Sequence, residues 1–197
     1  MPTAAAKSHG VTGDEIGDEG LAEVMTAYQR GEMAAFETLY AGFRGGLRRY
    51  LTALARDPAV ADDLLQETFL QLHRVRHTYQ PPRPVKPWVY AIARHVFLMN
   101  RRAAYRRGRH ETIADEALPE VPVPPEVESL GDRDTVERAL ANLPAARREP
   151  LVLHHMLGMS FKEVGAVLGI SEGAAKVRAH RALAEIREAM GVKGAKS

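Results

Sequence analysis

Two clusters of proline divide this chain and constrain its fold more than any other feature of the sequence. The first occupies residues 78–87 and contains four prolines, and the second places four more between residues 119 and 125. Proline has no backbone N–H and clashes with the preceding helical turn, so neither cluster fits the interior of a helix. The fold must therefore be built from the segments that these clusters separate.

Those segments carry apolar residues at the spacing of amphipathic helices. Between residues 21 and 54 apolar side chains recur every three or four positions, and Leu65, Phe69 and Leu72 repeat the pattern further on. Asp57 followed by Pro58 predicts a helix start, because the carboxylate caps free N–H groups and proline is tolerated at the first helical position. Each glycine of the pair 45–46 costs about 1 kcal/mol in a helix, which predicts a bend or break there.

The chain is predicted to be all-α, with two small helical domains, because no segment shows the alternation of a strand. In the basic segment after residue 87, we expect Trp88, Ile92, Val96 and Met99 to share one side of a helix, with Trp88 as a core anchor. The predicted organisation is a flexible tail at 1–18, a domain at 19–110, an acidic proline-rich linker at 111–131, a domain at 132–190 and a tail at 191–197.

The formal net charge of +2 hides a strong segregation of charge along the chain. Residues 1–67 contain 6 basic and 11 acidic side chains, whereas residues 68–110 contain 10 basic and no acidic ones. Residues 111–137 contain 9 acidic against 1 basic, and residues 138–197 return to 10 basic against 5 acidic. A salt-bridged surface would mix the signs, so two basic regions on either side of an acidic one predict surfaces that face a polyanion.

The segment 160–187 has the local chemistry of a helix-turn-helix. Ser160 with Glu163 forms a capping box. Gly169 is suited to the left-handed backbone conformation that ends a helix, and Ser171 caps the next helix. That second helix is basic, as a helix that enters the major groove must be. Two features depart from the usual pattern: Gly165 and Ala175 are small where the motif carries larger residues, and a proline at 150 should distort the preceding helix.

Three stretches resemble sigma factors of the extracytoplasmic-function group in the sigma-70 family. DDLLQETFLQLHR at 62–74 and PWVYAIARHVFLMNRR at 87–102 are similar to their region two, and LPAARREPLVLHHMLGMSFKEVGAVLGISEGAAKVRAHRAL at 143–183 is similar to their region four. The resemblance implies a factor that binds core RNA polymerase and directs it to promoters without catalysing a reaction. An anti-sigma factor is a further implied partner, and the acidic linker would thread near the active-site cleft or act as a spacer.

The resemblance also assigns three sets of residues. A polymerase-docking face is implied at Asp62, Asp63, Gln66, Glu67 and Leu70, minus-ten DNA contacts at Arg83, Lys86, Arg94, His95, Asn100, Arg101 and Arg102, and minus-thirty-five contacts at Ser171, Glu172, Gly173, Lys176, Arg178, His180 and Arg181. His95 departs from the asparagine usual in the family, which puts the contact at that position in doubt. For each docking residue, a solvated helix face is the alternative interpretation.

Other function classes find little support in the sequence. The chain has no cysteine, the histidine pairs 73/77 and 154/155 lack further ligands at a recognisable spacing, and no phosphate-binding loop or nucleophile elbow is present, so we expect no enzyme activity, no metal and no cofactor. Without an apolar segment long enough to span a membrane, the chain is predicted to be cytoplasmic. The alternatives are a stand-alone helix-turn-helix regulator and a protein-interaction module, and both would act without directing polymerase to start sites.

Overall fold

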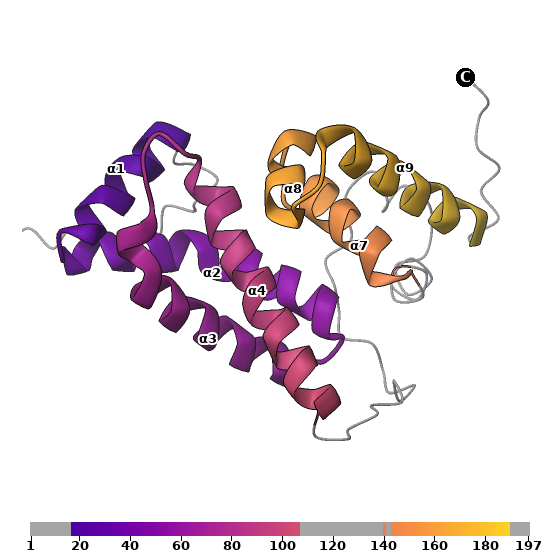
Figure 1. The fold of residues 1–197 in the computed structure, drawn as a ribbon, viewed down its shortest axis with the longest axis horizontal. Coiled ribbons are helices and arrows are strands. Elements are labelled where there is room, and N and C mark those ends of the chain that lie inside the picture. The colour runs from indigo at the N-terminus through magenta and orange to yellow at the C-terminus, as the bar shows by residue number, and fades with distance from the viewer. Residues whose placement is uncertain (1–16, 107–139, 141–142, 190–197) are drawn as a thin grey trace, which may run out of the picture.

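The computed structural model describes residues 17–106, 140 and 143–189, and within these ranges every regular element is helical. In chain order the elements are α1 (Asp18–Gln29), α2 (Met33–Ala55), α3 (Pro58–Val75), the 3₁₀ turn η1 (Arg76–Thr78), α4 (Val85–Arg106), α7 (Ala145–Leu151), the π-helical turn η2 (Val152–Met156), α8 (Phe161–Leu168) and α9 (Glu172–Ala189). Helices α1–α4, the N-terminal half, form one group, and α7–α9, the C-terminal half, form a second beside it (Figure 1). The all-α prediction is confirmed. The predicted linker, 111–131, and nearly all of both predicted tails lie outside the described residues.

Helix α3 starts as the sequence predicts. The Asp57 side chain accepts hydrogen bonds from the backbone N–H groups of Ala59, at 2.8 Å, and Val60, at 3.3 Å, and Pro58 is the first helical residue. The helix runs to Val75 and buries Leu65, Phe69 and Leu72 against its neighbours. The opposite side of α3 is thereby left facing outward.

Helix α2 continues through glycines 45 and 46, so the predicted break is wrong. At Gly46, close contact with another helix offsets the conformational cost of glycine. A side chain at Gly46 would collide with the hydroxyl of Tyr90 in α4 and touch Leu157 of the C-terminal half. Gly46 therefore makes room for neighbouring side chains, and Tyr90 packs edge-on against Tyr50, with ring centroids 5.5 Å apart.

Helix α4 begins at Val85, so the predicted proline-rich loop 78–87 is too long at its C-terminal end. Its third residue is a proline, which fits the first turn because N–H groups there have no intrahelical acceptor. The expected apolar side is also partly wrong: Val96 is buried, Trp88 and Ile92 are half-buried, and Met99 is 44% exposed. The fully buried positions are Val85, Val89 and Ala93, on an adjacent stripe of similar apolar character that the sequence pattern did not separate from the expected one.

The helix that contains Pro150 changes its hydrogen-bond pattern, as the proline predicts. Helix α7 ends one residue after Pro150, and the π-helical turn η2 follows directly. Part of the C-terminal half has a small core of its own, formed by Leu140, Leu143, Leu151, Ala182, Leu183 and Ile186. The other apolar residues of this half do not join that core.

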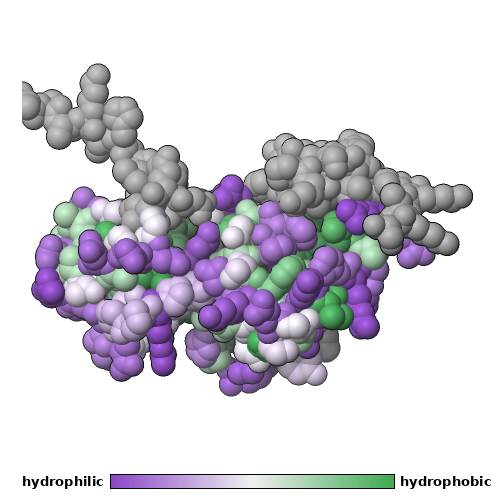
Figure 2. All heavy atoms as spheres, turned by 90° about the horizontal axis from the view of Figure 1, so that it is seen from above, coloured by the Kyte–Doolittle hydropathy of each residue, from purple (hydrophilic) through white to green (hydrophobic). Residues whose placement is uncertain are grey.

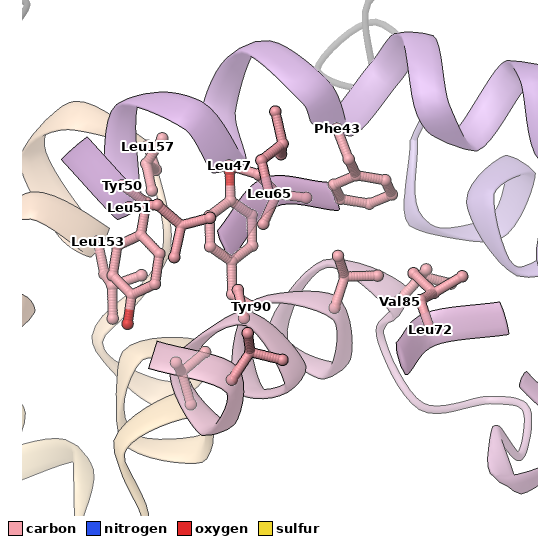
Figure 3. Packing of buried hydrophobic residues seen from close by; sticks show 14 of the residues in the cluster. Phe43, Leu47, Tyr50, Leu51, Leu65, Leu72, Val85, Tyr90, Leu153 and Leu157 are labelled. Atoms are coloured by element: carbon pink, nitrogen blue, oxygen red, sulfur yellow. The ribbon is translucent and has the colours of Figure 1, made fainter. Parts of the chain in front are cut away.

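Instead, they join the core of the N-terminal half. Val152, Leu153, Leu157 and Met159 are buried in the same cluster as Leu47, Tyr50, Leu51 and Tyr90. Leu153 and Leu157 lie beside Tyr50 and Leu51 in Figure 3. Helix α8 contacts α4, and η2 contacts α2. The two halves therefore form one closed body, and their described atoms make one continuous surface in Figure 2.

Candidate functional site

The helix-turn-helix forms as its sequence predicts. The Ser160 side chain accepts a hydrogen bond from the backbone N–H of Glu163, whose carboxylate accepts one in return from the Ser160 N–H at 2.8 Å. Helix α8 ends at Leu168, and at the capping residue Gly169 φ is 68°, where a residue without a side chain is favoured. The hydroxyl of Ser171 then accepts a hydrogen bond from the N–H of Ala174 in the first turn of α9. Together these caps fix the angle between α8 and α9.

The two small residues of the motif allow a tight turn. A Cβ at position 165 would lie 2.7 Å from the carbonyl oxygen of Ile170, which is closer than real side chains approach. Gly165 is therefore required where the turn folds back on α8, and Ala175 is fully buried in α9. Their small size brings the two helices together and leaves the basic side of α9 outward.

The predicted minus-thirty-five residues lie at the exposed start and along the exposed side of α9. All seven are exposed: Ser171, Glu172, Gly173, Lys176, Arg178, His180 and Arg181. The buried residues of α9, Ala175, Ala179, Ala182, Leu183 and Ile186, occupy its other side. This separation gives a basic surface held by a rigid helix, which suits a contact with the grooves and phosphates of DNA.

The predicted minus-ten residues are in two different environments. Arg83, His95, Asn100, Arg101 and Arg102 are exposed on α4 and the turn before it, and Arg101 lies over the ring of Phe97. Lys86 and Arg94 are half-buried instead, and both contact the C-terminal half. Five of the seven predicted minus-ten residues are therefore exposed, and the other two, Lys86 and Arg94, are held against the C-terminal half.

The predicted docking face lies on α3. Asp63, Gln66, Glu67 and Leu70 are exposed, Leu70 by 53%, while the apolar stripe of the same helix is buried. Asp62 forms an ion pair with Arg48 at 2.7 Å, and this hydrogen bond holds the pKa of its carboxyl below the ordinary value. Glu67 pairs with Arg74 on the surface. An exposed leucine among polar side chains is an arrangement that a protein partner can cover.

In each of the two histidine pairs, one histidine contacts an aromatic side chain. His73 shares a hydrogen bond with the hydroxyl of Tyr28 at 2.7 Å, and the ring of His154 stacks on Phe161. Among the residues that the structure describes, no three acidic or histidine side chains come close enough to hold a metal ion. Nor does any helix in these ranges have the length and apolar character needed to cross a membrane.

Comparison with known proteins places this arrangement in a family. Residues 39–107 match the family model described as Sigma-70 region 2, and residues 133–186 match Sigma-70, region 4. The chain is 36% identical over 171 residues to the RNA polymerase sigma factor CarQ of Myxococcus xanthus, covering 85% of this chain and 95% of CarQ. It is 32% identical to the ECF RNA polymerase sigma factor SigL of Mycobacterium tuberculosis over 157 residues, which are 79% of this chain and 89% of SigL.

This chain belongs to the sigma-70 family, in its extracytoplasmic-function group. Solved structures of similar fold include the sigma factor RpoE with the anti-sigma factor NepR from Bartonella quintana, with a TM-score of 0.66, 23% identity and coverage of 81% of this chain and 98% of that one. Another is CnrH with the cytosolic domain of CnrY, with a TM-score of 0.63, 25% identity and coverage of 88% and 96%. As a sigma factor, the protein binds core RNA polymerase and directs promoter-specific initiation, and it is not an enzyme.

Sequence reasoning missed the residues that join the two halves of this sigma factor. Arg148 and Glu149 of α7 are buried, at 8% and 5% exposure, and both contact the N-terminal half. Charged residues are rarely buried unless they are paired. The only available signal was the position of Glu149, an isolated acidic residue among the basic side chains of the C-terminal segment.

Proposed function

We propose that this sigma factor divides its work among three helices: α3 docks on core polymerase, α4 with the turn before it contacts the minus-ten element, and α9 contacts the minus-thirty-five element. The observation that carries this assignment is the separation of surfaces. The exposed side of α3 is polar with a single large apolar residue, Leu70, whereas the exposed sides of α4 and α9 are basic. A protein partner and a polyanion favour these two kinds of surface respectively.

The docking assignment is tested by a double variant, Gln66→Ala with Glu67→Lys. Both residues are exposed, so the fold should change in stability by no more than about 0.5 kcal/mol. A charge reversal inside a complementary interface costs more, and we expect affinity for core polymerase to fall about tenfold or more. Fluorescence anisotropy of the labelled sigma factor measures that affinity, and circular dichroism checks the helix content.

Glu37→Lys supplies the matched control, because it reverses an exposed charge on α2, a helix that carries none of the predicted docking residues. Its polymerase affinity should equal that of the wild type. Wild-type affinity in the double variant would contradict the docking assignment. A chain that binds promoter DNA with full specificity in the absence of polymerase would favour the stand-alone regulator instead.

We further infer that the factor acts in the cytoplasm, where polymerase and DNA are, and that a protein inhibitor controls it. CnrH, which is 25% identical to this chain, was solved in complex with the cytosolic domain of a second protein. Co-purification of the tagged full-length chain from its own host, followed by mass spectrometry, tests this partner. Recovery of polymerase subunits alone from uninduced cells would argue against an inhibitor.

A further inference from the structure

An ion pair joins the two halves at the helix assigned to the minus-ten element. Arg94 of α4 donates from Nε to the Oε2 of Glu149 in α7, at 2.9 Å. The Arg94 side chain is 28% exposed and that of Glu149 only 6%. Because water has little access to this pair, salt screens it less than an exposed pair.

A second cation of α4 is held by the C-terminal half as well. Lys86 donates from Nζ to the carbonyl oxygen of Leu157, at 2.8 Å. Lys86 and Arg94 both belong to the predicted minus-ten set, and each bonds an oxygen acceptor of the C-terminal half. A phosphate oxygen of DNA is an acceptor of the same kind, and it would need the same N–H groups.

In a third polar contact across the interface, the donor belongs to the C-terminal half and the acceptor to the N-terminal half. Arg148 of α7 donates from Nη1 to the carbonyl oxygen of Ala53 in α2, at 2.9 Å, and from Nη2 to that of Leu143 within its own half. Burial, with a smaller contribution from Arg56, lowers the pKa of Arg148 to about 10, so its charge is retained at neutral pH. Adjacent residues of α7 therefore hold both α2 and α4.

The closed arrangement covers one functional surface and leaves the others accessible. The minus-thirty-five residues of α9 are exposed, as are Asp63, Gln66, Glu67 and Leu70 on α3. Of the residues predicted to contact DNA or polymerase, Lys86 and Arg94 of α4 bond acceptors of the C-terminal half. Closure can therefore interfere with minus-ten contacts while polymerase still reaches its docking face.

We propose that Glu149 keeps the free sigma factor closed by occupying Arg94 in place of a DNA phosphate, so that single-stranded DNA and Glu149 compete for one arginine. This proposal rests on the assignment of α4 as a DNA-binding surface. Because the closed form cannot offer Arg94 to DNA, the observed DNA affinity is reduced by the fraction of molecules that are closed. By linkage, DNA that binds α4 must favour the open form by the same factor.

The experiment uses the full chain, whose lack of cysteine allows two labels to be placed cleanly. Glu37→Cys on α2 and Glu188→Cys on α9 are exposed sites on the two halves, and energy transfer between dyes there reports closure. Glu149→Gln is then introduced, which removes the charge and keeps the shape of the side chain. We expect lower energy transfer and about tenfold tighter binding of a short oligothymidylate.

Glu185→Gln is the matched control. Glu185 of α9 also pairs with an arginine, Arg147, but both residues belong to the C-terminal half. It makes the same change in net charge, so energy transfer and oligothymidylate affinity should both stay at wild-type values. An equal gain of DNA affinity in both variants would show a general charge effect and overturn the proposal.

The remaining outcomes also decide the question. Wild-type protein should lose energy transfer as oligothymidylate is added, and constant transfer at saturating DNA would overturn the proposal even if Glu149→Gln failed to fold. A folded Glu149→Gln protein that stays closed, or that opens without binding DNA more tightly, would overturn it too. Binding of the labelled wild type to core polymerase is measured separately, so failure of the docking assignment is distinguishable from failure of this proposal.

Discussion

The basic surfaces of α4 and α9 look alike in the sequence but differ in the folded protein. Each has several arginine or lysine residues on an amphipathic helix. On α9 every residue predicted to contact DNA is exposed, whereas on α4 Lys86 and Arg94 bond acceptors of the other half. A basic residue in a sequence therefore predicts an affinity for anions. The neighbouring elements of the fold determine which anion or carbonyl group its side chain contacts.

The largest test of this difference removes apolar contact between the halves. Leu157→Ala should lower the free energy of unfolding by about 2–4 kcal/mol, because Leu157 is buried between the halves and its loss leaves a cavity. Urea denaturation followed by circular dichroism measures the loss. We also expect the labelled pair at positions 37 and 188 to show a more open protein.

Leu183→Ala is the counterpart within the C-terminal half, since Leu183 belongs to the separate cluster of that half. It should cost a similar free energy without separating the halves. If both variants opened the protein equally, the contact at Leu157 would have no special part in closure, and the contrast between α4 and α9 would lose its physical basis.

A second test compares two lysines chemically. Lys86 donates to the Leu157 carbonyl in the interface, and Lys176 is exposed on α9. Because acylating reagents attack an accessible, unbonded amine, Lys176 should be acetylated about tenfold faster than Lys86, which corresponds to about 1.4 kcal/mol of protection. Mass spectrometry of peptides after brief treatment with an acetylating reagent measures both rates.

The ratio of the two acetylation rates should change when the protein opens. In Glu149→Gln the rate at Lys86 should rise toward that of Lys176, with the Lys176 rate unchanged. Equal rates in the wild type would mean that the first half of α4 is as accessible as α9.

The smallest expected effect is at a hydroxyl buried between the halves. Tyr50 is fully buried, and its oxygen has no hydrogen-bond partner among the described residues. Burial raises the pKa of its phenol well above the usual value, so the group stays neutral near physiological pH. Tyr50→Phe removes an unsatisfied polar atom and should stabilise the protein by about 1 kcal/mol, independently of pH in that range.

Thermal unfolding at several neutral pH values measures this gain, with Tyr90→Phe as the comparison at a neighbouring ring. A loss of stability in Tyr50→Phe would reveal a hydrogen bond to the hydroxyl in solution. No equivalent substitution exists among the DNA-binding residues predicted on α9, because their side chains are exposed and none has a polar atom buried without a partner.

Local chemistry in the sequence was sufficient to predict the caps of α3, α8 and α9. Asp57, Ser160 and Gly169 act within a few residues of their own positions, so their roles are confirmed without knowledge of the fold. The exposed side of α3 was also predicted, because burial of Leu65, Phe69 and Leu72 fixes which side faces outward. Predictions of this kind depend on spacing alone.

Contacts between distant segments could not be predicted in the same way. Gly46 suggested a bend by its propensity, whereas its role is to accommodate Tyr90 and Leu157, which lie far away in sequence. Arg94 was assigned to DNA by the family resemblance, and its partner Glu149 is 55 residues further along the chain. Each of these roles depends on the tertiary arrangement, about which composition and periodicity carry no information.

The shared core of the two halves has a consequence for the length that the protein can span. Promoter elements centred near positions −35 and −10 are separated by about 25 base pairs, or about 85 Å of duplex. A compact body of about 140 residues has a radius of gyration near 14 Å, so its two ends are only about 40 Å apart. The closed body is too short to read both elements of one promoter at once. A covalent chain of 33 residues, the number from 107 to 139, can span at most about 110 Å, so the connection between the halves is long enough to allow that distance.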